Sequence, residues 1–361
     1  MSATITFDSE TIPELQKQKP QTPWSRRTGS FKRDVAIAVI VPALIIAALF
    51  LTTDIPGPVI MIAIYLPLQL IASIIAAISQ RGTKAAADAV IIVCAIGATL
   101  FSFIILISLL WSIVSKGMEA MSWSFISQNN EYISPSTPLG WGGVGHAVLG
   151  TIMIVVIATL ISMPIGVATA LYITEVRGRA VPYVRFFVQA MSGVPSVVAG
   201  LFILTVFIIT GVLQQSALTG ALAYAILMLP TVARTAEEVL RLIPDDLRTG
   251  ALALGSTRAR VVLKVVIPAA KTGLITAMIL GIARVVGETA PLLMTSLKND
   301  KTVLNPIMEP ITALPVYIFS NVAQPYPAAV ARAWGAALVL MVLVAILFTT
   351  TRILTSKRRG R

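Results

Sequence analysis

Two charged residues, Arg284 and Glu288, stand one helical turn apart in the otherwise apolar segment 274–297. A charge near the centre of a bilayer is costly, so one that is present there usually faces a partner or a water-filled path. An arginine offers a planar fork of donors that suits a phosphate-like oxyanion, and a neighbouring carboxylate can hold or release that arginine. The spacing predicts that both side chains lie on one helix face. The alternative interpretation is an internal salt bridge that only joins helices.

The elements around this pair are those of a polytopic, all-α membrane protein. Of the 361 residues, 56% are hydrophobic and only 12% are charged, and the mean hydropathy is +0.86. A soluble protein carries about twice that charged fraction. Apolar stretches long enough to cross a bilayer predict about eight transmembrane helices. They cover residues 35–51, 59–78, 89–114, 144–173, 186–212, 217–232, 274–297 and 328–351.

The positive charge of the chain indicates its orientation in the membrane. With the N-terminus in the cytoplasm, nearly all of the 28 Lys and Arg residues fall on the inner side. Only Lys116, Lys298 and Lys301 lie in outer loops, and Arg284 and Arg332 lie within spans. This bias predicts that both termini are cytoplasmic, and it accounts for the net charge of +12 without a nucleic-acid partner.

The connecting segments differ in character. Residues 1–34 have the composition of a disordered cytoplasmic tail. The outer loops 115–143 and 298–327 contain aromatic and apolar residues that favour the membrane interface, or a docking surface for an outer partner. The inner segment 233–271 is long and has the signals of two helices, so it is either an ordinary amphipathic hairpin or a lever gripped by another protein.

The helix signals of the inner segment follow each other in order. Pro244, Asp245 and Asp246 predict a helix start, since acids favour the positive end of a helix. That helix is predicted to end at Gly255, with Ser256 capping the next helix and Pro268 closing it. Leu247, Ala251 and Leu254 would form one apolar face of the first helix.

The sequence excludes several kinds of chemistry. It has no glycine-rich phosphate loop of the type that binds nucleotides. A single His and a single Cys make a zinc site or a Ser-His-Asp triad implausible. We therefore expect no catalytic residue, metal or cofactor in this chain, so the energy for any uphill transport must come from a partner or from an ion.

The inner segment resembles the signature loop of bacterial ABC-importer permeases, E-A-A-x-x-x-G followed after nine residues by I-x-L-P. Here this register starts at Thr249, Gly250 and Ala251, reaches Gly255, and ends at Pro268, with Thr249 in place of the usual Glu. Three further motifs narrow the family to the permeases of phosphate importers. They are GGVG at 142–145, SGVPS at 192–196 and GETAPLL at 287–293, of which the last resembles PstA-type subunits more than PstC-type subunits.

The resemblance implies a six-helix permease core over residues 89–355, with residues 35–80 as two additional N-terminal spans. It implies a plasma-membrane (inner-membrane) subunit of a bacterial ATP-driven phosphate importer, with inorganic phosphate and membrane lipid as its contacts. The implied protein partners are a PstC-type permease subunit, a dimer of PstB-type ATPase subunits that bind the ATP, and an extracytoplasmic PstS-type phosphate-binding protein. In this family the inner loop forms the helix that docks on the ATPase.

Two sets of residues are predicted to carry the function. The substrate pathway would include Arg284, Glu288, Thr289, Ser192, Ser196 and Arg332, with Arg332 more typical of an arginine that snorkels to the interface. Coupling to the ATPase would use Asp245, Asp246, Leu247, Thr249, Gly250, Ala251, Leu254, Gly255 and Pro268. A permease for another small oxyanion and an ion-coupled secondary transporter remain as alternatives.

Overall fold

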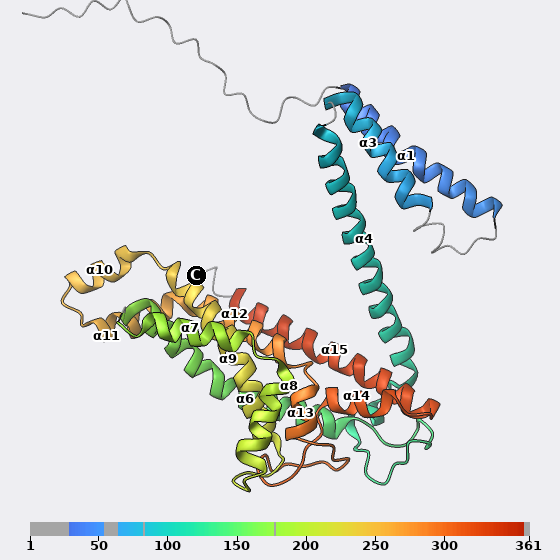
Figure 1. Cartoon of the computed structure of the whole chain (residues 1–361). Helices are drawn as coiled ribbons and strands as arrows, with labels where there is room; N and C mark the ends of the chain where they lie inside the picture. The colour runs from blue at the N-terminus through green and yellow to red at the C-terminus, as the bar shows by residue number, and fades with distance from the viewer. Residues whose placement is uncertain (1–28, 54–63, 82–83, 177, 357–361) are drawn as a thin grey trace, which may run out of the picture. The chain divides into compact units, whose positions relative to one another are not determined.

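The computed structural model describes residues 29–53, 64–81, 84–176 and 178–356. No strand occurs among these residues, which confirms the all-α prediction for this part of the chain (Figure 1). The chain divides into two compact units, Met1–Ser108 and Leu109–Arg361. The boundary falls inside the long helix α4 (Lys84–Gly117), which begins in the first unit and ends in the second.

The first unit contains a helical hairpin of α1 (Gly29–Thr52) and α3 (Leu66–Arg81). Because α1 starts at Gly29, the last residues of the predicted disordered tail are helical, and the rest of that tail lies outside the described residues. Pro42 inside α1 has no N–H, so the carbonyl of Ala38 has no partner within its own helix. The Gln69 side chain of α3 donates to that carbonyl at 3.1 Å and thereby joins the two helices.

The second unit is built around α9 (Ala217–Arg241), which contacts α6 (Gly145–Leu171) and α12 (Ile267–Val285). Val232 of α9 is fully buried, and its side chain lies against Gly166 of α6 and Gly281 of α12. A Cβ on either glycine would come within 2.8 Å of that side chain, so the missing side chains let the helices approach closely. α15 (Pro327–Ser356) packs against α12 and α14 (Leu314–Val322).

The predicted fifth span is two helices rather than one. α7 (Val181–Ser192) and α8 (Ser196–Ile203) are bent by 102° at the intervening Gly193-Val194-Pro195, and a π-helical turn, η4 (Leu204–Ile208), continues α8. The SGVPS motif therefore produces a full break, since Pro195 cannot continue the preceding helix.

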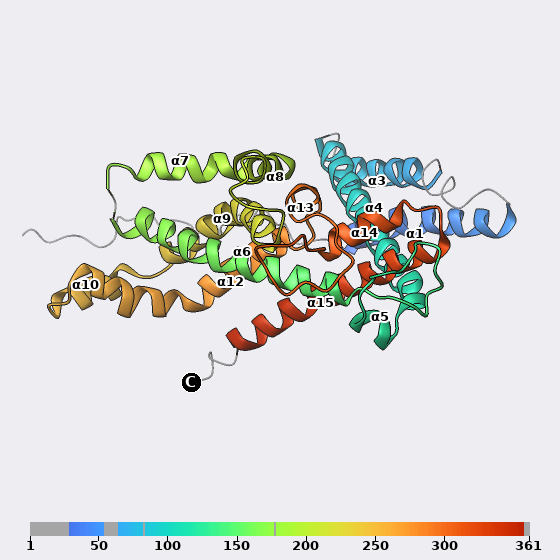
Figure 2. The ribbon, with the colours of Figure 1, turned by 90° about the horizontal axis from the view of Figure 1, so that it is seen from below.

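The predicted inner segment 233–271 begins as a continuation of α9, which runs to Arg241. It then forms α10 (Asp245–Ala253) and α11 (Arg258–Val261). Gly255 has φ +81, which confirms its predicted role as the helix terminator, whereas the cap of α11 is Thr257 rather than Ser256. Pro268 does not close a helix as predicted, because a π-helical turn, η5 (Val262–Val266), precedes it and the helical stretch runs from Arg258 to Val285. In both views α10 lies at one end of the unit, and α13 (Ala290–Thr295) and α14 lie towards the other (Figures 1 and 2).

Five described helical stretches are long and apolar enough to cross a membrane: Ala87–Ala120, Gly145–Val176, Ala217–Arg241, Arg258–Val285 and Pro327–Thr349. The bent pair of α7 and α8 would make a sixth. The two predicted N-terminal spans coincide with shorter apolar helices, Ala36–Thr52 and Pro67–Ile78. The predicted count of eight is therefore not confirmed, although each predicted position holds an apolar helix or helix pair.

Candidate functional site

The predicted seventh span is broken between Arg284 and Glu288. α12 ends at Val285, and the Glu288 amide donates back to the Val285 carbonyl at 3.0 Å in a tight turn before α13 begins at Ala290. Gly287 has a low helix propensity, and Pro291 disfavours helical backbone in the residue before it. The prediction that Arg284 and Glu288 share one helix face is therefore wrong, because Glu288 lies beyond the helix end.

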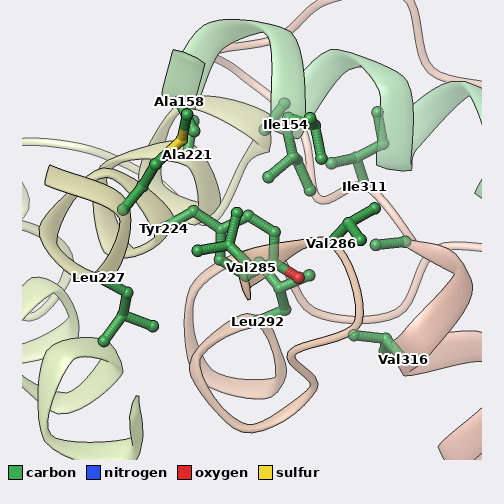
Figure 3. Close-up of a cluster of buried hydrophobic side chains, with 14 of the residues drawn as sticks. Ile154, Ala158, Ala221, Tyr224, Leu227, Val285, Val286, Leu292, Ile311 and Val316 are labelled. Carbon is green, nitrogen blue, oxygen red and sulfur yellow. The ribbon is translucent and has the colours of Figure 1, made fainter. Parts of the chain in front are cut away.

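The break is held by contacts from two other helices. Tyr224 of α9 is 1% exposed, and its hydroxyl donates to the Glu288 carbonyl at 2.6 Å. Its ring lies with Val285 and Leu292 in the main buried cluster of the unit (Figure 3). On the other side, Gly200 of α8 lies against Pro291, and a Cβ there would stand only 2.7 Å from the Pro291 Cα. The backbone of the break is thus fixed by packing and by one hydrogen bond.

The two charged side chains at the break have no charged partner among the described residues. Arg284 is exposed and Glu288 is partly exposed, and no ion pair of the described chain includes either of them. The salt-bridge interpretation is therefore not supported in this conformation. Thr289 follows directly, is partly exposed, and precedes the first residue of α13.

Arg284 lies on a face of α12 that no other described element covers. Thr272, Thr276, Leu280 and Arg284 recur every four residues along that face, and all are exposed. On α6 the exposed residues at the same spacing are Ile152, Val156 and Leu160, which are apolar. A lipid-facing helix surface is expected to be apolar, so the polar face of α12 is better suited to a second protein surface or to a polar path.

The serines of the SGVPS motif differ from each other. Ser192 uses its hydroxyl within α7, donating to the Val188 carbonyl at 3.0 Å. Ser196, the first residue of α8, is partly exposed and makes no side-chain hydrogen bond among the described residues. The structure therefore leaves Ser196 more open to a ligand than Ser192.

Arg332 does not reach the surface. It is 1% exposed, and its Nη2 donates to the carbonyls of Thr137, Pro138 and Trp141 at 2.7, 3.0 and 3.1 Å. Burial raises the pKa of the phenol of nearby Tyr317, although the positive charge of Arg332 acts in the opposite direction. The expectation of a snorkelling arginine is thus wrong, since its guanidinium fastens the segment 115–143 to α15.

The predicted coupling residues form an exposed projection. Asp245, Asp246, Leu247, Thr249, Gly250, Leu254, Gly255 and Pro268 are all exposed. Ala251 alone is half-buried, because it packs with Val261 and Val265 beside η5. Most of the predicted set is therefore open to a partner. The predicted apolar face is not continuous, because Ala251 packs against the protein while Leu247 and Leu254 are exposed.

Arg248 of α10 was not predicted, yet it makes the most contacts in this region. Its side chain is 15% exposed and bonds Glu175 at 3.0 Å, where Glu175 belongs to the π-helical turn η3 (Tyr172–Val176) that continues α6. It also donates to the carbonyls of Leu240 and Ile243. The carboxylate is 73 positions away along the chain, so no local pattern could reveal the pair.

A second ion-pair cluster joins α7 to α9. Glu237 bonds Arg185 at 2.9 Å and Arg241 at 2.6 Å. These side chains border a hollow of about 290 Å³ that Arg234 and Glu238 also line. Among the described residues no group of His, Cys, Asp and Glu side chains could hold a metal ion.

Comparison with known proteins shows the family of the chain. The family model of binding-protein-dependent transport system inner membrane components matches residues 162–360, which include the break and the projection. A phosphate transport system permease protein PstA 1 of Mycobacterium tuberculosis (strain CDC 1551 / Oshkosh) is 38% identical over 242 residues, 66% of this chain and 79% of the relative. The phosphate transport system permease protein PstA of Yersinia pestis is 32% identical over 270 residues, 74% of this chain and 90% of the relative.

Among solved structures, one chain of an inward-facing MetNI methionine ABC transporter is 19% identical, with a TM-score of 0.48, and the match covers 60% of this chain and 94% of that one. The family model spans more than half of this chain, and the two permeases are matched over most of their length. This multi-pass membrane protein therefore belongs to the family of binding-protein-dependent transport system inner membrane components.

Proposed function

We propose that the chain is a transmembrane permease subunit of a bacterial ATP-driven phosphate importer. We infer phosphate as the substrate from the two relatives, since both are phosphate transport system permeases of the PstA type. The chain would form half of the translocation path with a PstC-type permease, above two PstB-type ATPase subunits. An extracytoplasmic PstS-type protein would deliver phosphate from outside, and both termini would face the cytoplasm.

The unpaired Arg284 on the uncovered face of α12 carries this proposal. An exposed guanidinium in a spanning helix is free to bind an oxyanion by charge-assisted hydrogen bonds. Glu288 beyond the break would accept a hydrogen bond from a protonated phosphate, which sulfate cannot offer at neutral pH. The pair would bind the anion weakly enough to release it, as conduction requires.

The exposed projection of α10 supports the energetic part of the proposal. This chain would contribute no catalytic residue and no cofactor of its own, and ATP would be bound and hydrolysed in the ATPase subunits. Asp245, Asp246, Leu247 and Thr249 would contact those subunits, since all four are exposed on α10.

The decisive measurement is phosphate uptake by cells that express the complete importer with Arg284→Gln. Loss of a charge-assisted contact to the anion lowers uptake by about 10- to 100-fold. Arg179→Gln, at an exposed arginine outside both predicted sites, is the matched control and should retain wild-type uptake. Unchanged uptake by Arg284→Gln, at equal membrane levels, would contradict the anion site. Uptake that persists without the ATPase subunits would identify a secondary transporter.

A further inference from the structure

α10 has one charged side chain that turns inward. Its charged residues are Asp245, Asp246 and Arg248, and only Arg248 is largely covered, with 15% of its side chain exposed against 74% for Asp245. The outward residues are accounted for by docking of a partner. Arg248 Nη1 bonds Asp245 at 2.9 Å, and the remaining bonds of this largely covered guanidinium go to other helices and need a separate explanation.

The guanidinium of Arg248 joins three elements. Its Nε and Nη2 bond one carboxylate oxygen of Glu175 in η3, at 3.2 and 3.0 Å. Nη2 also donates to the Leu240 carbonyl at 3.0 Å, and Nη1 donates to the Ile243 carbonyl at 2.7 Å, just past the end of α9. The last carbonyls of a helix have no partner within it and carry its negative end, so a cation is favoured there. One side chain therefore ties α10 to the inner ends of both α6 and α9.

Glu175 depends on Arg248. Its side chain is 14% exposed, and Arg248 is its ion-pair partner among the described residues. Removal of one partner from a largely covered pair leaves an uncompensated charge, which is strongly unfavourable. Separation of the pair is therefore costly, which favours its staying together when α10 is displaced, whereas an exposed pair on flexible side chains would absorb the displacement.

α10 also rests on a second π-helical turn. Ala251 packs in the apolar cluster with Val261 and Val265, and α10 contacts η5. The two residues of α10 that turn inward, Arg248 and Ala251, thus reach the turns at the inner ends of α6 and α12 respectively. π-helical turns within α-helices frequently occur at functional sites.

We propose that Arg248 is a positioning residue that converts a displacement of α10 into a displacement of α6 and α9 through its bonds to Glu175 and to the end of α9. This inference rests on the proposed function, in which α10 is gripped by an ATPase subunit. Arg248 touches neither the anion nor the ATP. Its loss therefore uncouples ATP hydrolysis from transport, and does not abolish either the docking of the ATPase or the binding of the anion.

The test uses the complete importer reconstituted in liposomes, with phosphate uptake and ATP hydrolysis measured on the same samples. Glu175→Gln keeps the shape of the side chain and removes the ionic bond to Arg248. We expect the number of phosphate ions moved per ATP to fall at least about threefold, while the ATPase subunits still co-purify with the complex. Glu238→Gln is the matched control, since Glu238 is exposed on nearby α9 and has no ion pair among the described residues, and it should keep the wild-type ratio.

A wild-type ratio in an assembled Glu175→Gln complex would overturn the proposal. If that variant does not assemble, Arg248→Lys is tested instead. Lysine keeps the charge but cannot bond Glu175 and both carbonyls together. The ratio should fall there too, and an unchanged ratio would again refute the role of Arg248. Failure of the proposed function can be told apart from failure of this inference, since the wild-type complex itself would then show no ATP-dependent phosphate uptake.

Discussion

Arg284 and Arg248 belong to helices of the same unit, but their surroundings are opposite. Arg284 is exposed on α12 and has no ion-pair partner among the described residues. Arg248 is 15% exposed and bonds a carboxylate together with two carbonyls at the end of α9. A free guanidinium is ready to bind an anion, and a saturated one can only hold protein segments together. The contrast separates a residue that would meet the substrate from a residue that would transmit movement.

The backbone around each arginine shows the same contrast. At the break beyond Arg284, the Glu288 carbonyl is held by Tyr224 and Pro291 packs on Gly200, so the main chain is fixed while the charges remain free. At α10, the charge of Arg248 is paired with Glu175 and joins α10 to the ends of α6 and α9. The part of the molecule proposed to bind phosphate is thus preorganised by apolar packing, and the part proposed to couple it is organised by ion pairs.

The largest expected effect comes from Arg248→Ala. This change leaves Glu175 largely covered and without its partner, and should lower the free energy of unfolding by about 3 kcal/mol. SDS-induced unfolding of the purified protein in mixed micelles measures it. Arg284→Ala is the comparison, and its effect should stay within about 0.5 kcal/mol because no partner is lost. Equal losses of unfolding free energy in the two variants would contradict the distinction between the paired Arg248 and the unpaired Arg284.

An intermediate effect is expected from Tyr224→Phe. The Glu288 carbonyl then loses its donor in a buried site, which should cost about 1 kcal/mol of stability and loosen the break. Tyr317→Phe is the matched control, since the Tyr317 hydroxyl is buried and has no hydrogen-bond partner among the described residues. That control should be neutral or stabilising. SDS-induced unfolding measures both variants. A greater loss of stability in Tyr317→Phe than in Tyr224→Phe would refute the assigned role of the Tyr224 bond.

The smallest effect on stability is expected from Glu288→Gln. With no ion pair to lose, its free energy of unfolding should change by less than about 0.5 kcal/mol. Phosphate uptake should nevertheless fall, since an amide carries no charge with which to release Arg284. Uptake and unfolding measured on the same preparation separate the two roles. A marked loss of stability would show that Glu288 has a structural partner.

Much of the fold could be predicted from local signals. The positions of the apolar helices follow from hydropathy, and the end of α10 follows from Gly255, whose φ of +81 suits glycine. The break after Arg284 was also encoded, in Gly287 and Pro291, but the apolar character of segment 274–297 outweighed these two residues in the prediction. Length and hydropathy identify a membrane segment without revealing whether its helix is continuous.

The contacts between distant residues could not be predicted. Arg248 and Glu175 meet because η3 and α10 converge, and the charge pattern of either segment alone resembles a solvated surface. The place of Arg332 near a helix end predicts a snorkelling side chain. Its partners are instead carbonyls of a distant loop, of which Thr137 lies 195 positions earlier. Such bonds depend on tertiary geometry, for which a single sequence has no local signal.

The bond between Gln69 and Ala38 has a consequence for how the N-terminal hairpin is made. Without α3, the Ala38 carbonyl opposite Pro42 has no donor, and a buried unsatisfied carbonyl costs about 1–3 kcal/mol. α1 therefore lacks one backbone hydrogen bond by itself. The hairpin is complete only when both helices are present, because Gln69 of α3 supplies the donor that Pro42 removes from α1.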